Sequence, residues 1–417
     1  MRIWLIQQGE PLQGIDSGAR DWRCGILAKT LVARGHEVLW WASTFNHAQK
    51  CHRFNEPRTI EIMPGLKIRL LHGPGYGCSK SPRRFWHHRV LAGAFAKEAS
   101  ASNKPDLIFS SLPTLELAEQ AVLYGQRTRV PVLVDVRDLW PDLYLTLVPR
   151  YFRFLLKIAL SSEFRRGRRL LAGATGITAI SNTYLEWALK NADRQRRECD
   201  GVFQMGYHGQ KDSLLGKAIS EKVETLASAY GLGTKDLILT FVGSFTPSFD
   251  MLTVIEAARI INQNASENIK FLIVGEGDMG EKWRLRAKGI DNIIFTGWFD
   301  QVSIAAIFRL SNAGLAPYDN ALISLPNKPF EYMAAGLPLL SSLRGELEDL
   351  IRIEQIGLQY QAGKANSLVE QIRWLVTHPA EREDMGLRAR RLFEERFSAE
   401  VIYPRLVEHL EKVACHE

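Results

Sequence analysis

Lys328 and Glu331 are the two residues of this chain whose types and spacing point most directly to chemistry. They lie in Pro326-Asn-Lys-Pro-Phe-Glu-Tyr-Met-Ala334, where a loop is predicted to enter a helix. A helix start offers unpaired N–H groups to phosphate oxygens, Lys328 adds a full charge, and Glu331 can accept hydrogen bonds from ribose hydroxyls. The segment therefore predicts a nucleotide diphosphate site. An ordinary amphipathic helix with a solvated lysine and glutamate is the alternative.

A second charged loop, Asp135-Val-Arg-Asp-Leu-Trp-Pro-Asp142, directly follows an apolar run that is predicted to be a strand. Ligands of parallel α/β sheets bind beyond the carboxyl ends of strands, so Arg137 and Asp138 are candidate site residues. A strand end held by salt bridges is the structural alternative.

Both segments resemble motifs of retaining glycosyltransferases of family 4, which have the two-domain GT-B fold. The similarity is to a subgroup with the motif Pro-x-Lys-x-x-Glu-Tyr-Met-Ala, found among enzymes that build bacterial surface polysaccharides. The usual motif of the family has a second glutamate eight positions before Glu331, where this chain has Ile323. The resemblance implies that Arg137 or Asp138 lines the acceptor site and that Lys328 and Glu331 hold the donor.

Three further loops are similar to loops of that family, one of them the glycine-rich loop on the acceptor side and two in the second domain. The resemblance implies that Gly18 approaches the donor phosphates, that Gly243 and Ser244 face the diphosphate, and that Gly297 and Trp298 border the base. Asn327, next to Lys328, completes the predicted donor-binding set. Trp298 and its neighbour Phe299 could instead be core aromatics.

The predicted phosphate clamp of this chain depends on Lys328. Relatives with the longer motif often carry an arginine and a lysine at the positions of Ser244 and Asp250, and neither residue here is basic. Lys328 is the natural substitute, so we expect it to stabilise charge on the departing diphosphate. Lys328, Asp138 and Arg137 are therefore the predicted catalytic residues.

Apolar runs alternate with helical patterns along the chain, which predicts an α/β fold with two Rossmann-like domains whose parallel sheets face each other across a cleft. The expected domains are 1–207 for the acceptor and 208–397 for the donor, with a helix at 398–417 packing back on the first domain. The expected strands of the two domains are Ile3–Gln7, Glu37–Ala42, Leu66–Leu71, Leu107–Ser110, Pro131–Asp135, Gly176–Ile180, Leu237–Val242, Lys270–Val274, Asn292–Thr296, Ala313–Ala316, Leu337–Ser341 and Gly357–Tyr360.

Positive charge is concentrated in the first half of the chain. Residues 1–200 contain 30 Lys and Arg against 18 Asp and Glu, and the remainder contains 23 against 28. The basic, aromatic segments 79–89, 149–157 and 165–169 suit an anionic membrane surface, although their cations could also be a solvated helix face over core aromatics. No nucleic-acid-binding pattern is present. We find no pattern typical of a signal peptide or of a membrane span. The five cysteines lack metal-ligand spacing, so we expect free thiols in a reducing compartment. The expected location is therefore the cytoplasm, peripheral on the inner face of the membrane.

The function implied is transfer of a sugar, an N-acetylated hexosamine or a related one, from a UDP-linked donor to a glycan or a polyprenyl-linked acceptor, as in lipopolysaccharide synthesis. The resemblance implies retention of configuration and no cofactor. We expect no metal either, because the chain has no Asp-x-Asp pair. A nucleotide-sugar 2-epimerase and a non-catalytic nucleotide-sugar-binding subunit are the alternatives. Thermal shifts with nucleotide sugars would separate donors.

Overall fold

The computed structural model describes residues 1–16, 21–78, 81–146, 148–208, 212–264, 267–319 and 325–415. The chain divides into two compact units. Unit 1 comprises Met1–Gly206 and Ile402–Glu417, and unit 2 comprises Tyr207–Val401.

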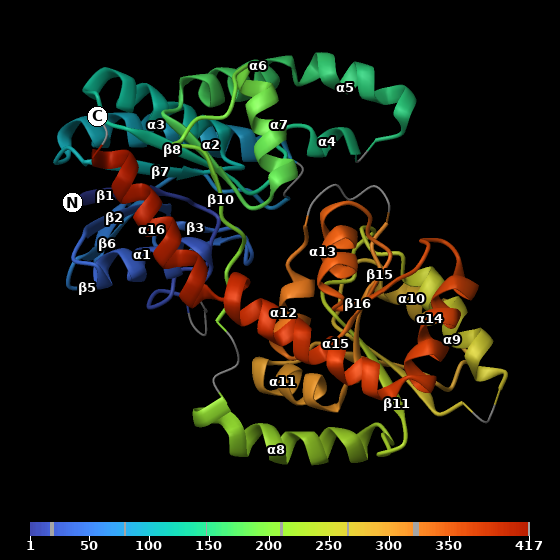
Figure 1. Ribbon diagram of the computed structural model, residues 1–417. Coiled ribbons are helices and arrows are strands. Elements are labelled where there is room, and N and C mark those ends of the chain that lie inside the picture. Colours follow the sequence, from blue (N-terminus) through green and yellow to red (C-terminus); the bar gives the residue numbers. More distant parts are fainter. Residues whose placement is uncertain are drawn as a thin grey trace. The chain divides into compact units, whose positions relative to one another are not determined.

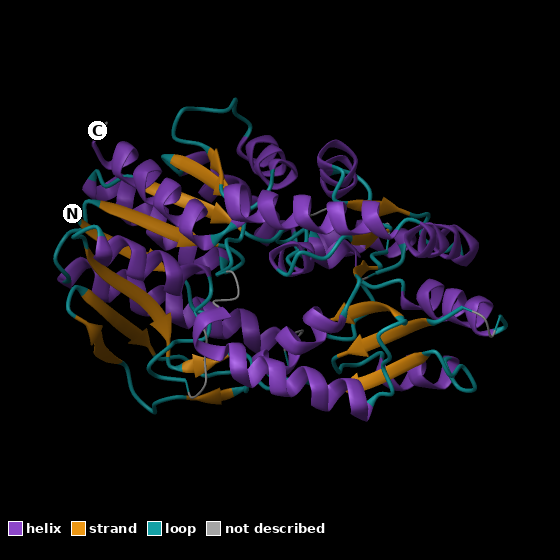
Figure 2. Cartoon of the chain, turned by 60° about the horizontal axis from the view of Figure 1, so that its bottom comes forward, coloured by secondary structure: helices purple, strands orange, loops and turns teal. Residues whose placement is uncertain are grey.

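Unit 1 contains a sheet of eight strands in the order β10-β9-β8-β7-β1-β2-β6-β5, parallel except for β5, and a separate hairpin of β3 and β4. Helices lie on both faces of the sheet (Figure 1, Figure 2). Its strands are β1 (Arg2–Ile6), β2 (Glu37–Ser43), β3 (Phe45–Asn46), β4 (Cys51–His52), β5 (Arg58–Met63), β6 (Leu66–Leu71), β7 (Leu107–Ser111), β8 (Val132–Val136), β9 (Gly176–Ala179) and β10 (Gly201–Val202). Its helical segments are α1 (Arg23–Ala33), α2 (Pro82–Ala101), α3 (Leu115–Thr128), α4 (Leu143–Thr146), η1 (Arg150–Phe152), α5 (Arg153–Ala159), α6 (Ser161–Gly173), α7 (Asn182–Ala192) and most of α16 (Ala399–Cys415).

Unit 2 contains a parallel sheet of six strands in the order β13-β12-β11-β14-β15-β16. Its strands are β11 (Leu237–Val242), β12 (Ile269–Val274), β13 (Ile293–Gly297), β14 (Ala313–Ala316), β15 (Leu339–Ser341) and β16 (Gly357–Gln359). Its helical segments are α8 (Asp212–Ala229), α9 (Met251–Asn262), α10 (Gly280–Arg286), α11 (Gln301–Leu310), α12 (Lys328–Ala334), α13 (Glu346–Glu354), α14 (Ala365–Thr377), α15 (Pro379–Leu392) and η2 (Phe393–Phe397).

Each strand expected from the sequence is present, with its ends shifted by at most two residues. The central strands β7, β8 and β11 are buried at every position, because helices cover both faces of a parallel sheet. The two expected α/β units with parallel sheets are thus confirmed. The short strands β3, β4, β5 and β10 were not predicted, and β5 makes the edge of the unit 1 sheet antiparallel.

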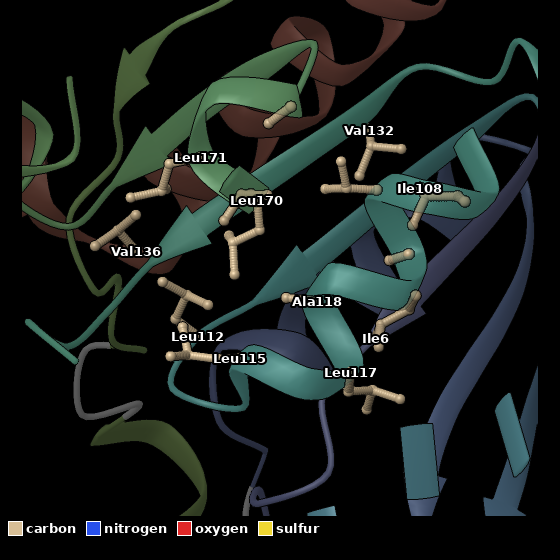
Figure 3. Packing of buried hydrophobic residues seen from close by; sticks show 14 of the residues in the cluster. Ile6, Ile108, Leu112, Leu115, Leu117, Ala118, Val132, Val136, Leu170 and Leu171 are labelled. Carbon is tan, nitrogen blue, oxygen red and sulfur yellow. The ribbon is translucent and has the colours of Figure 1, made fainter. Parts of the chain in front are cut away.

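The core of unit 1 packs helix α3 onto the middle of the sheet. Leu115 and Ala118 of α3 contact the cluster formed by Ile108 of β7 and Val132 of β8, all at most 2% exposed (Figure 3). The last helix, α16, belongs to this unit as well, because Glu411 pairs with His36 at 2.9 Å and His409 lies 3.1 Å from the Cys199 carbonyl. This packing holds the strand ends at fixed positions.

Among the described residues, no helix has the length and apolar character needed to cross a lipid bilayer.

In each unit the strand order reverses beside the first strand. Strands β2, β1 and β7 are neighbours in unit 1, and β12, β11 and β14 are neighbours in unit 2. In sheets of this kind the loops beyond the carboxyl ends of the strands at the reversal form the ligand site. The loops after β1 and β11 are therefore the places to look for function.

Candidate functional site

Helix α12 is fixed to the unit 2 sheet by Tyr332. The buried hydroxyl of Tyr332 donates to the Leu315 carbonyl at 3.1 Å and accepts from the Val242 N–H at 3.0 Å. Its ring covers Gly314, where a side chain would collide with it. Because β11 and β14 flank the strand reversal, these contacts place the first turn of α12 at the carboxyl edge of the sheet.

Lys328 begins α12 and its side chain lies against Gly243, the first residue after β11. A Cβ at position 243 would collide with Nζ and Cε of Lys328, so only glycine leaves this ammonium where it is. The Lys328 Nζ also lies 5.7 Å and 5.9 Å from the ring centres of Phe241 and Phe249, which are favourable cation–π distances. The structure thus brings together two of the predicted donor-site residues.

The loops after β11, β12 and β13 are joined by backbone hydrogen bonds. The Gly243 N–H donates to the Val274 carbonyl and the Gly275 N–H to the Gly297 carbonyl, both at 2.9 Å. Gly275 has a φ of +137°, and a Cβ there would collide with the Gly243 carbonyl, so this close approach requires glycine. The result is a compact edge built from Gly243, Gly275 and Gly297.

The other predicted donor-site residues of unit 2 lie around this edge. Ser244 and Asn327 are exposed, Glu331 is half-buried one helical turn after Lys328, and Trp298 is 75% exposed. Trp298 is therefore not a core residue, whereas its neighbour Phe299 packs against the unit 2 core. Gly18 and Ile323 lie outside the described residues.

Asp250, at the position where relatives with the longer motif often carry a lysine, has a structural role. Its carboxylate caps α9, accepting from the Thr253 N–H at 3.3 Å and the Thr253 hydroxyl at 2.6 Å. It also accepts from the Gly363 N–H at 2.7 Å. The carboxylate thus holds the start of α9 to the loop after β16.

Arg137 lies in a buried charge network at the carboxyl ends of β1, β7 and β8. Its guanidinium donates to Asp135 at 2.6 Å, to Ser111 Oγ at 2.7 Å, to Cys24 Sγ at 3.1 Å and also to Glu10. The guanidinium N–H groups of Arg137 therefore bind other protein groups. This is the arrangement expected of the structural alternative, a strand end held by salt bridges. A catalytic role for Arg137 stays a prediction, and its contacts favour positioning the loop.

Asp135 is the centre of this network and is fully buried. It accepts from two nitrogens of the equally buried Arg23, both at 3.0 Å, and from the Thr178 hydroxyl at 2.8 Å. Burial alone would raise the pKa of Asp135, but the charges of Arg23 and Arg137 outweigh it and hold the pKa at about 2. Burial and, as the second largest cause, the negative charge of Glu10 raise the pKa of the Cys24 thiol to about 12. Cys24 is therefore not an activated nucleophile.

Asp138 follows Arg137 and is in a different environment. It is half-buried, and burial raises the pKa of its carboxyl, opposed by the Leu139 N–H and the charge of Arg84. A half-buried carboxyl beyond the end of β8 can form a hydrogen bond with a polar ligand group.

Histidines gather beside this edge of unit 1. His87 is fully buried and its Nδ1 accepts from the Gly75 N–H at 3.1 Å, so the ring is neutral with its proton on Nε2. His47 Nδ1 lies 2.6 Å from the Tyr76 hydroxyl. In the part of the chain that the structure describes, no group of three or more His, Cys, Asp and Glu could hold a metal ion.

We expect unit 1 to lose stability in mild acid because of these histidines. Burial lowers the pKa of His87 to about 3 and that of His47 to about 4, against 6.5 in the unfolded chain. Above pH 6.5 these histidines are neutral in both states and do not lower the free energy of unfolding. As the pH falls below 6.5, the unfolded chain binds more protons than the folded one, so the free energy of unfolding decreases. From pH 7.5 to 4.5, His87 alone should cost about 2–3 kcal/mol. Calorimetry across this range tests it. His87→Gln should reduce the dependence of stability on pH, whereas the control His208→Gln at an exposed site should not. If His87→Gln and the wild type depend on pH equally, the prediction is contradicted.

Several residues of the site had no signal in the sequence that singled them out. Tyr332 was part of the quoted motif, but its hydrogen bonds to β11 and β14 depend on tertiary packing. Arg23 and Glu10 reach Asp135 and Arg137 across 112 and 127 positions of the chain. Only the order of the strands brings these residues to one edge.

Comparison with known proteins adds the identity of the fold. Residues 236–378 match the family described as glycosyl transferases group 1. No curated protein matches the sequence. Sucrose-phosphate synthase from Thermosynechococcus elongatus superimposes with a TM-score of 0.72 at 18% identity, over 100% of both chains. Anabaena HepE in complex with UDP-glucose gives 0.65 at 14%, over 99% of this chain and 100% of that one. WaaG, a glycosyltransferase involved in lipopolysaccharide biosynthesis, gives 0.65 at 14%, over 98% and 99%.

These similarities define a protein with the GT-B fold, in which both units are α/β domains with parallel sheets. Residues 236–378, which match the glycosyl transferases group 1 family, lie within unit 2.

Proposed function

We propose that this chain transfers a sugar, with retention of configuration, from a UDP-linked donor bound by unit 2 to an acceptor bound by unit 1. The observation that carries the proposal is the contact of Lys328 with Gly243 at the strand reversal of unit 2. It sets an ammonium beside a glycine edge that a diphosphate can approach closely. HepE, which is similar in fold, was crystallised with UDP and with UDP-glucose, and this supports the choice of nucleotide.

In the proposed reaction, the bond between the sugar and the β-phosphate oxygen breaks and its electron pair stays on the phosphate. Lys328 offsets the charge that grows there, and the acceptor hydroxyl attacks the same face of the sugar. The departing phosphate takes the proton of that hydroxyl. Asp138 is proposed to hydrogen-bond to the acceptor, and Arg137 to hold the Asp138 loop in place through Asp135 and Glu10. Neither a metal nor a cofactor takes part in this scheme.

For the acceptor we propose a glycan or a polyprenyl-linked sugar of bacterial surface polysaccharide synthesis, and for the donor an N-acetylated hexosamine or a related sugar. The resemblance of the Lys328 and Arg137 segments to one subgroup supports both choices, and the lipopolysaccharide role stated for WaaG supports the choice of acceptor. On this proposal the protein works in the cytoplasm at an anionic membrane surface.

A thermal-shift screen of nucleotide sugars, followed by product analysis, tests the proposal. A donor that binds the folded chain raises its melting temperature according to RT ln(1 + [L]/Kd). We expect UDP sugars to give the largest shifts. With acceptor present, NMR should show a product with the anomeric configuration of the donor, and EDTA should leave the rate unchanged. A free epimer formed without acceptor would instead identify an epimerase, and binding with neither transfer nor donor hydrolysis a non-catalytic subunit.

Replacing Glu331 with alanine should weaken UDP binding by about 1.5–3 kcal/mol, the range for a hydrogen bond to a charged group. The half-buried carboxylate lies one turn after Lys328 and is proposed to accept from the ribose hydroxyls. Titration calorimetry with UDP measures the loss. Glu370→Ala removes an exposed carboxylate of the same unit and is the control. An unchanged UDP affinity in folded Glu331→Ala protein would remove Glu331 from the site.

A further inference from the structure

Five large apolar side chains are exposed on one short stretch of unit 1, formed by η1 and α5. Tyr151, Phe152, Phe154, Leu155 and Ile158 are 75%, 51%, 72%, 61% and 57% exposed. Neither η1 nor α5 contributes a buried residue to the core, and Figure 1 shows α5 at the outer side of α4 and α6. A contiguous apolar surface of this kind marks a place of contact with something other than water. We call η1 and α5 the apolar arm.

Cations are interspersed with these apolar side chains. Arg150, Arg153 and Lys157 lie on the arm and are exposed. The sequence had left open whether the aromatics here fill the core beneath a solvated basic face. The structure shows that they do not, since Tyr151 and Phe154 are among the most exposed large apolar residues of the described chain.

A basic groove continues from the arm onto α6 and α7. It has a volume of about 660 Å³ and shares Lys157 with the arm. Its charged lining residues are Lys157, Arg168, Arg169, Lys190, Asp142 and Asp193. Four of them are cations and two are carboxylates, and one carboxylate, Asp142, accepts from the Trp187 indole at 3.2 Å. The groove therefore has an excess of positive charge and suits an anionic group.

We propose that the apolar arm inserts into the interfacial layer of a bilayer containing anionic phospholipids, while the basic groove binds lipid phosphate groups. An interfacial segment needs an apolar face that enters the lipid and cations that meet the headgroups, and the arm with its groove has both. The inference rests on the proposed function in that it explains how a membrane-borne acceptor is reached. It adds the surface and the mode of attachment.

The surroundings of the arm favour lipid over a second copy of this chain. In a two-fold dimer the same patch faces itself, so Arg150, Arg153 and Lys157 would meet their own equivalents. Like charges brought together in this way oppose association.

Much of the basic 165–169 segment predicted for membrane contact is ion-paired within the fold, since Arg166 donates to Glu119 and Glu163 and Arg169 to Glu119. The arm is thus the better candidate for the primary contact.

Flotation of the full chain with phosphatidylcholine vesicles, with or without 30% phosphatidylglycerol, tests the apolar part. We expect the wild type to float with the anionic vesicles. The double change Phe154→Ala and Leu155→Ala should reduce partitioning by about tenfold or more, since the apolar area entering the lipid falls. Leu285→Ala with Leu387→Ala is the matched control, because these side chains are 71% and 61% exposed in unit 2. This control should float like the wild type.

The charged part is tested by Lys157→Gln, Arg168→Gln and Lys190→Gln together. Each cation near an anionic surface contributes about fivefold in affinity, so the triple change should weaken binding on the order of 100-fold at low salt. The exposed unit 2 residues Lys288, Arg352 and Lys364, changed to Gln together, are the control. Salt should weaken the binding of the wild type more than that of the triple variant, which keeps Arg150 and Arg153 of the arm.

Calorimetry with UDP on every variant keeps this inference separate from the proposed function. Normal UDP binding with no flotation of the wild type would overturn the membrane surface and leave the donor site intact. Flotation of the wild type with no UDP binding would overturn the donor site and leave the membrane surface intact. Equal flotation with both kinds of vesicle would overturn the role of the groove. If sedimentation shows dimers that Phe154→Ala abolishes, and vesicles are ignored, the arm is a self-association surface and the proposal fails.

Discussion

Lys328→Met should slow sugar transfer by about 10²–10³-fold, or about 2.7–4 kcal/mol, the usual loss on removing one donor to a developing oxyanion. Methionine keeps apolar bulk beside Phe241 and Phe249 and removes only the charge that lies against Gly243. The fold should therefore survive. UDP affinity should fall less than the rate, because the charge on the phosphate is larger in the transition state than in the ground state.

Two matched measurements decide this point: single-turnover transfer and UDP binding, each for wild type and variant. Lys288→Met removes an exposed lysine of the same unit and should change neither quantity. Equal losses of rate and UDP affinity in Lys328→Met would mean that Lys328 anchors the donor in both states. Its role in bond breaking would then have to be abandoned.

Asp135→Asn should destabilise unit 1 by about 3–5 kcal/mol, the usual cost of removing one partner from a buried ion pair. The change leaves Arg23 and Arg137 buried at the strand ends, Arg137 with Glu10 as its remaining carboxylate and Arg23 with the Gln204 carbonyl. The contribution of Asp135 is complete above the unfolded pKa of about 3.9 and is lost as the pH falls toward about 2. At neutral pH the full effect should therefore be visible.

Scanning calorimetry and urea unfolding followed by circular dichroism measure this loss, with the transition of unit 2 as an internal reference. Asp193→Asn makes the same chemical change at an exposed position, where φ is +52° and asparagine is well tolerated. This control should stay within about 0.5 kcal/mol of the wild type. An Asp135→Asn protein as stable as the wild type would show that the network contributes nothing net to folding.

The sequence was sufficient to predict the sheets of both units, because parallel strands covered on both faces are near-continuous apolar runs. Strands such as Leu237–Val242 and Leu66–Leu71 were predicted with the ends that the structure shows. The edge strand Arg58–Met63 was missed, since it is largely exposed and its pattern is not an apolar run. Two-residue strands carry too little pattern to be recognised.

Part of the candidate site was also predictable, because residues close in sequence share one loop or one helical turn. Lys328 and Glu331 lie three positions apart, and a helix start brings such residues to one side whatever the rest of the fold does. Trp298 could not be placed in the same way. Whether an aromatic is exposed or buried depends on which elements cover it, and its neighbour Phe299 packs against the core.

By itself, the sequence determined the α/β class, the positions of twelve of the strands and the motif that places a lysine and a glutamate on one helix start. These properties depend on local periodicity and on spacing. The tertiary structure decided that Lys328 meets Gly243, 85 positions away, that Arg137 is engaged with Asp135 and Glu10, and that the aromatics of α5 face outward. The order of strands in a sheet sets which loops meet, and burial depends on every element packed nearby, so neither could be inferred from local pattern.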